Sequence, residues 1–189
     1  MKRTLLAIIA IAAIACVVGC SSGRRWSEKE RADVRREVRA YRDMAYLDNL
    51  EEVEFDIFAG DVTEAIEIDY PVYTTFVELP GRGDTVEVYV VQTIVSELQA
   101  DAHNMRKLYP YKELVAEGVL PPNLDRQAQR AFYQCFANSV DNTFASTSAF
   151  FNAVLADTIA NSQIEQMQRQ CASDLFDWVV EVDEIIFFD

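Results

Sequence analysis

The segment TVEVYVVQTIV, residues 85–95, decides which fold class the chain can adopt. Its β-branched side chains and partial alternation are typical of a β-strand. It nevertheless continues without a helix breaker into SELQADAHNMRKL, and its apolar residues keep helical spacing at Val86, Val90, Ile94, Leu98 and Met105. A strand here would have no partner elsewhere in the chain, and an isolated strand is not stable. The pattern therefore predicts one long helix, capped by Asp84, and an all-α fold.

Apolar residues recur at helical spacing through the rest of the chain. Ser27 and Glu30 form a capping box at the start of the first helix. We expect the second helix to bend or split at Gly60, and its apolar stripe consists of Leu50, Val53, Ile57, Phe58, Val62, Ala65 and Ile66. These patterns predict a single-domain bundle of about six to seven helices over residues 26–189, which Pro121 and Pro122 could divide in two.

Three helices are expected after Pro122, joined by the short polar links DNTFAS and ANSQ. Short links favour an up-down-up arrangement in which the first and third helices run parallel. Cys135 and Cys171 lie on the apolar stripes of those two helices, each about nine residues after its helix begins, so their sulfurs reach a similar height. We predict a disulfide between them in an oxidising compartment. The alternative is a pair of buried, unpaired thiols.

The first twenty residues carry a targeting signal. Lys2 and Arg3 precede an apolar stretch over residues 5–18, which is shorter than the roughly 20 residues that a membrane-spanning helix needs. This is the pattern of a secretory signal peptide, and the alternative is an uncleaved membrane anchor.

The residues that end this stretch, Val17-Val18-Gly19-Cys20, resemble the lipobox of bacterial lipoproteins. The resemblance covers only the signal region. It implies that Cys20 carries a lipid on its sulfur, that residues 1–19 are removed, and that residues 20–25 form a lipidated tether. Val17 is less usual than leucine at its position, and Cys16 is a competing candidate that lies too deep in the apolar run. Ser21 in place of aspartate resembles the outer-membrane sorting pattern, which implies a cell-envelope protein at the outer membrane, facing the periplasm.

Charge is divided unevenly along the expected mature chain. Removing residues 1–19 leaves 15 basic and 31 acidic residues, a net charge of −16, which argues against nucleic-acid binding. Residues 24–42 carry an excess of basic side chains and lie close to the lipid. We expect them to contact the membrane surface, and they are Arg24, Arg25, Lys29, Arg31, Arg35, Arg36, Arg39 and Arg42. The alternative is a solvated helix whose arginines pair with nearby glutamates.

Catalytic patterns are missing from the sequence. His103 is the only histidine, which excludes multi-histidine metal sites, and no P-loop, G-x-S-x-G or G-x-G-x-x-G motif occurs. Arg82, Gly83 and Asp84 match an adhesive tripeptide that arises easily by chance. We therefore predict no catalytic residue, no metal and no cofactor.

The expected function is a non-enzymatic binding or accessory module, anchored in the membrane by its lipid and docking an unknown protein partner. A contiguous exposed apolar patch would support this function. A small-ligand-binding lipoprotein, with a closed cavity between the helix groups before and after Pro121 and Pro122, is the main alternative. A carboxylate-dependent hydrolase, with two carboxylates of raised pKa in one cleft, is a third. The C-terminal residues 179–189, VVEVDEIIFFD, are more apolar than a free tail and are expected to pack on the body or against a partner.

Overall fold

The computed structural model describes residues 26–156 and 160–178, and every regular element in these ranges is helical. This confirms the predicted all-α class. The described ranges hold nine α-helices, rather than six or seven, and two short 3-10 helices. They are α2 (Glu28–Val38), η1 (Arg39–Tyr41), α3 (Glu52–Asp69), α4 (Tyr73–Val77), α5 (Arg82–Ala100), η2 (Ala102–Asn104), α6 (Met105–Leu108), α7 (Tyr111–Ala116), α8 (Arg126–Thr143), α9 (Thr147–Leu155) and α10 (Ala160–Phe176). The expected signal peptide, the tether with Cys20 and the apolar tail lie outside the described residues.

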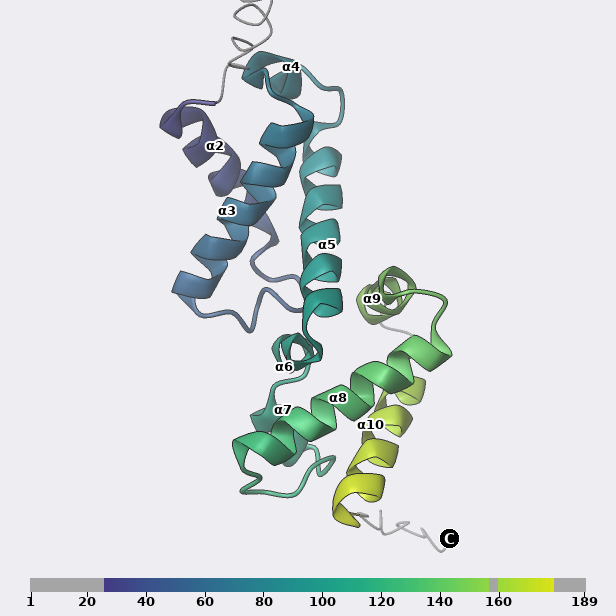
Figure 1. Cartoon of the computed structure of the whole chain (residues 1–189). Helices are drawn as coiled ribbons and strands as arrows, with labels where there is room; N and C mark the ends of the chain where they lie inside the picture. Colours follow the sequence, from purple (N-terminus) through teal and green to yellow (C-terminus); the bar gives the residue numbers. More distant parts are fainter. Residues whose placement is uncertain (1–25, 157–159, 179–189) are drawn as a thin grey trace, which may run out of the picture.

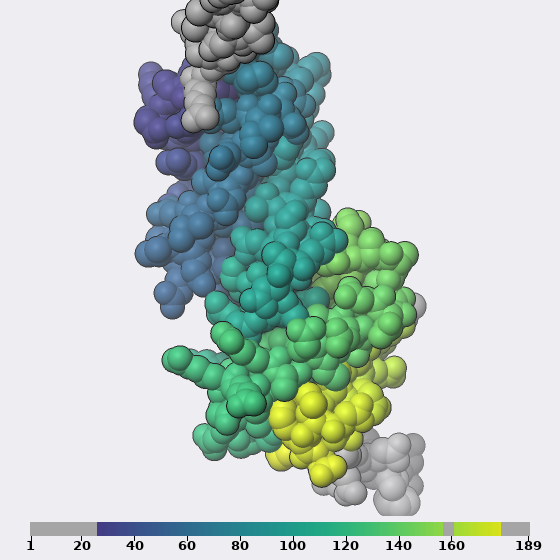
Figure 2. Space-filling model, viewed as in Figure 1, coloured from purple at the N-terminus to yellow at the C-terminus, as the bar shows by residue number. Residues whose placement is uncertain are grey.

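The helices form two groups that share helix α5. Helices α2, α3 and α4 pack with α5 at one end of the molecule, and α7, α8, α9 and α10 form the other end (Figure 1). Helix α5 contacts α2 and α3 in the first group and α9 in the second. Figure 2 shows the two groups as one continuous body, with α10 at the end far from α4. The buried residues of both groups belong to one continuous hydrophobic core.

Helix α5 buries the stripe that the sequence predicted: Val86, Val90, Ile94 and Leu98 are each at most 4% exposed. Its ends differ from the prediction. The helix begins at Arg82 after Gly81, whose φ of 75° is in the left-handed region, so Asp84 lies in the first turn and does not cap the helix.

The predicted single helix from Asp84 to Met105 is also interrupted. The Asn104 side-chain amide donates at 2.7 Å to the Glu97 carbonyl oxygen, which also accepts the backbone N–H of Asp101 in the last turn of α5. The Asp101 carboxylate accepts from the backbone N–H of His103 at 2.8 Å and caps η2. These two side chains end one helix and start the next, while Met105 remains buried in the core.

Helix α3 departs most from its predicted packing. It is continuous through Gly60, and its buried side includes Phe55, which was not in the predicted stripe. Val53 and Ile57, expected in the core, are instead 70% and 61% exposed. The helix carries more apolar residues than one face can bury, and Phe55, Phe58, Ala59, Val62 and Ile66 occupy that face.

The structure contains the predicted disulfide between Cys135 of α8 and Cys171 of α10, with a Cα–Cα distance of 5.9 Å. It does not reproduce the up-down-up arrangement. The Trp178 indole N–H, just after α10, donates at 3.1 Å to the carbonyl of Gly118, which precedes α8, so the two helices run in opposite directions (Figure 1). The disulfide was predicted correctly, but from the assumption that the two helices run parallel. In the structure the sulfurs meet where two oppositely directed helices cross.

A hydrogen bond and an ion pair on Glu97 join Tyr46 and Lys107 to the end of α5. Tyr46 is fully buried, with a φ of 84° that a non-glycine residue rarely adopts. Its hydroxyl donates to the Glu97 carboxylate, which also pairs with the Lys107 ammonium at 2.7 Å. The Lys107 nitrogen lies 5.2 Å from the centre of the Tyr46 ring. Burial and these bonds hold a backbone conformation that costs about 1–3 kcal/mol.

Removing the disulfide should lower stability without changing the fold. Replacing both Cys135 and Cys171 with serine should reduce the free energy of unfolding by roughly 3–4 kcal/mol, because the bond closes a loop of 36 residues in the unfolded chain. Urea denaturation followed by circular dichroism measures the change. Wild-type protein in reductant should match the double variant, and equal stability with and without the bond would contradict the prediction.

The protein should unfold at alkaline pH. Burial raises the pKa of Tyr46, Tyr109 and Tyr133. The unfolded chain releases their protons above pH 10, roughly the ordinary tyrosine pKa, while the folded chain retains them, so stability is complete below that pH and falls above it. Tyrosinate absorbance and circular dichroism, recorded together against pH, should show late ionisation that accompanies unfolding. Ionisation of all tyrosines near pH 10 in a folded protein would contradict this.

Candidate binding groove along helix α3

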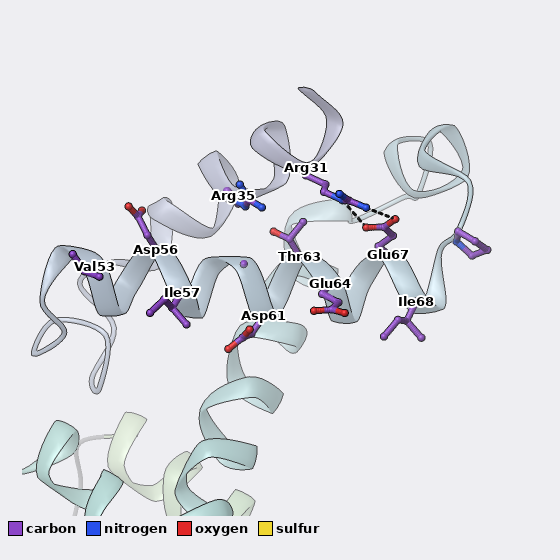
Figure 3. A pocket seen from close by; sticks show the side chains of 12 residues that line it. Arg31, Arg35, Val53, Asp56, Ile57, Asp61, Thr63, Glu64, Glu67 and Ile68 are labelled. Carbon is purple, nitrogen blue, oxygen red and sulfur yellow. Dashed lines mark hydrogen bonds and ion pairs between the residues drawn. The ribbon is translucent and has the colours of Figure 1, made fainter. Parts of the chain in front are cut away.

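The three most exposed large aliphatic side chains of the described residues, Val53, Ile57 and Ile68, all belong to α3 and are 61–71% exposed. They line a groove of about 930 Å³ between α2 and the outer face of α3 (Figure 3). The groove is formed by Arg31, Arg35, Val53, Asp56, Ile57, Gly60, Asp61, Thr63, Glu64, Glu67, Ile68 and Pro71. Half of these residues are charged, so the groove combines exposed aliphatic side chains with charged ones.

The groove follows the spacing of a helix-packing face. Val53, Ile57, Gly60, Glu64 and Ile68 recur every three or four residues, so they lie in one row along α3. The predicted core stripe merged part of this row with the buried one and placed both in the core. The missed signal was the number of apolar residues in α3, which suits two faces better than one.

Gly60 forms the floor of the groove at the middle of the row. A Cβ atom built at this position would meet no atom within 4 Å, so the space above it is open. Its neighbours in the row, Ile57 and Glu64, both carry long side chains. The result is a depression between these two side chains.

The α2 side of the groove is held by a network around Glu67. The Arg31 guanidinium donates to both Glu67 carboxylate oxygens, at 2.8 and 3.0 Å, and to Glu28 at 2.8 Å. These hydrogen bonds raise the pKa of Arg31 further above its usual range. Glu67 also accepts from the backbone N–H of Trp26 at 3.0 Å. Figure 3 shows this ion pair on one side of the α3 axis and Ile57, Asp61 and Ile68 on the other.

Trp26 fixes the point where the chain enters the fold. Its side chain is only 3% exposed, and its indole N–H donates to the Tyr70 carbonyl at 2.9 Å. Its ring centre lies 5.1 Å from that of Tyr73 and 5.4 Å from that of Phe76. Because Glu67 and Tyr70 lie at the end of α3, Trp26 lies beside the Pro71 end of the groove.

The opposite edge of the groove is acidic. Asp61 and Glu64 have no hydrogen-bond or ion-pair partner in the described part of the chain. Partial burial, together with the charges of Glu97 and Glu64, raises the pKa of Asp61. These carboxylates lie near one another without a bound cation from the described residues, so a cationic group brought to this edge would be attracted.

The basic residues predicted to contact a membrane have two fates. Four of them bond within the protein: Arg31 as above, Arg36 to Asp33 at 3.2 Å, Arg39 to Glu52 at 2.7 Å and Asp56 at 2.6 Å, and Arg42 to the Leu50 carbonyl. Lys29 and Arg35 are exposed and form no ion pair with another described residue. Arg24 and Arg25 lie outside the described ranges. The membrane contact therefore stays a prediction, and of the described residues Lys29 and Arg35 are the ones free to make it.

Other chemistries lack a described site. Within residues 26–156 and 160–178, no group of three or more histidine, cysteine, aspartate or glutamate side chains is placed to hold a metal ion. His103 packs edge-on against Tyr133 at 5.8 Å, away from the groove lining. No helix in the same ranges has the length and apolar character needed to cross a bilayer.

Comparison of the chain with models of known protein families, with curated proteins and with solved structures gave no match.

Alanine at two glycines should have opposite effects on stability. Gly60→Ala should raise the free energy of unfolding by up to about 1 kcal/mol, because the site is helical and open. Gly81→Ala should lower it by about 1–2 kcal/mol, because φ there is +75° and the added Cβ would lie 3.3 Å from the Asp84 carboxylate. Urea denaturation measures both. Loss of stability in Gly60→Ala would mean that the groove floor is already covered.

Proposed function

We propose that this chain is a lipid-anchored, non-enzymatic binding module of the bacterial cell envelope that docks a protein partner in the α3 groove. The observation that carries the proposal is the row Val53, Ile57 and Ile68, at 61–71% exposure beside two unpartnered carboxylates. Exposed aliphatic side chains clustered on one face are costly in water and mark interaction surfaces. A protein partner would remove them from solvent.

The anchor in this proposal is the lipid on Cys20, which rests on the lipobox resemblance. Trp26 lies six positions after Cys20, so the tether reaches at most about 20 Å. Trp26 is fixed beside α4 and the end of α3, which would keep that end of the molecule near the bilayer. The Cys135–Cys171 disulfide supports an oxidising compartment such as the periplasm. Outer-membrane placement follows from the residue after Cys20.

Small-ligand binding is the second candidate, favoured by a groove volume within the usual range for ligand sites. Ligand pockets normally enclose most of the ligand surface, however, and the aliphatic side chains of this groove are more than half exposed. A long, open, helix-spaced surface suits a macromolecular partner better. No described residue gives comparable support to a hydrolase.

Removal of the lipid site should release the protein from membranes. In Cys20→Ala, the protein should lose acylation and move from the membrane fraction to the soluble or unprocessed fraction, because the tether would have no lipid to hold it. Fractionation with mass spectrometry of the mature N-terminus makes the measurement. Cys16→Ala is the matched control and should remain anchored. Membrane retention and an intact residue 1–19 segment in both variants would contradict the anchor.

A further inference from the structure

We infer that the partner segment bound by the α3 groove is an amphipathic α-helix with an apolar ridge and lysine or arginine along one flank. The inference rests on the proposed binding function and adds the chemistry of the occupant. It follows from three features of the groove: its helix-type spacing, its depression at Gly60 and its acidic edge.

The spacing of the groove suits a helix rather than an extended segment. Ile57, Gly60, Asp61 and Glu64 stand in the i, i+3, i+4, i+7 relation that forms the receiving hole in knobs-into-holes packing. One of the four residues that bound this hole is Gly60, where a Cβ would contact nothing within 4 Å, so the hole is wider than one bounded by four full side chains. A leucine-sized side chain from a facing helix fits such a hole.

The length of the row sets the length of the occupant. Val53 and Ile68 are fifteen residues apart on one continuous helix, which corresponds to about 23 Å. An occupant of about 15 residues would cover all three exposed aliphatic side chains. Its other side would lie against α2, where Arg31 and Arg35 line the groove.

The carboxylates of the groove that are unpaired in the described residues indicate which side of the bound helix should be basic. Asp61 and Glu64 lack partners in the described ranges, and the pKa of Asp61 is raised. A basic side chain on that edge would relieve the repulsion between carboxylates. The other two carboxylates of the groove already bind arginines, Asp56 with Arg39 and Glu67 with Arg31, so they do not compete for the occupant. An anionic surface would be repelled by the same edge, which disfavours acidic headgroups as the occupant.

Site-specific photocrosslinking tests the inference in the full, lipidated chain held in phosphatidylcholine nanodiscs. The photoreactive residue p-benzoylphenylalanine replaces Ile57 in the groove or, as the matched control, Val88, an aliphatic residue of α5 that is 52% exposed and lies outside the groove lining. Two synthetic helical peptides of about 16 residues are the probes. Both have leucine at helical spacing, and one carries lysine and the other glutamate on the polar face.

The lysine peptide should crosslink to position 57 and not to position 88, and the glutamate peptide should crosslink to neither. Adding Gly60→Leu should lower the yield at position 57 by about tenfold, because it fills the hole. Adding Asp61→Asn with Glu64→Gln should lower the yield and weaken its dependence on salt.

Three results would overturn the inference: equal crosslinking of the lysine peptide at positions 57 and 88, crosslinking of position 57 to lipid, or a crosslinked dimer of the chain. The first would show unspecific attraction to an acidic protein, and the others would assign the face to the bilayer or to a second copy. Failure of the lipid anchor can be told apart from failure of this inference, since a chain that is not lipidated would still crosslink the lysine peptide at position 57.

Discussion

Burial of one aliphatic row on α5 is the constraint on which the rest of the structure depends. The row runs through Val86, Val90, Ile94 and Leu98, and the helix that carries it contacts α2 and α3 at one end and α9 at the other. Its last turn also holds Glu97, which binds Tyr46 and Lys107. The two helix groups therefore share one core. A substitution that empties part of the row would destabilise both groups, which the Pro121-Pro122 boundary alone would not suggest.

The same arrangement explains why α3 presents a free surface. Phe55, Phe58 and Val62 fill the side of α3 that faces the core, and this leaves its remaining aliphatic residues on the outside. Arginines of α2 and η1 do not cover them: Arg31 and Arg39 are bound to carboxylates at the edges of α3, and Arg35 is exposed at the groove lining. The charge of α2 thus stabilises the walls of the groove. Helix α3 packs against α2 and α5, and its second apolar face is left without a covering helix in the described residues.

The sequence predicted those features of the fold that depend on residues close together in the chain. The helical class, the Ser27 capping box and the buried row of α5 all follow from spacing along one chain segment. The sequence could not show which of two apolar faces of α3 would be buried, because both satisfy the same period. It also could not give the direction of α10 relative to α8, since a central crossing brings Cys135 and Cys171 together in either sense. The alternative of arginines paired with nearby acids covers the pair Arg31–Glu28, but the partners of Arg31 and Arg39 on α3 are distant in sequence and could not be named.

Trp26 has a mechanical consequence. A force applied to the chain before Trp26 would not unfold the first turn of α2, because the indole packs against Tyr73 and Phe76 and its N–H donates to the Tyr70 carbonyl. The force would pass through Glu67 into α3, the helix that forms the groove floor. If a lipid holds the chain at Cys20, a force on that lipid and the binding of a partner in the groove would both act on α3.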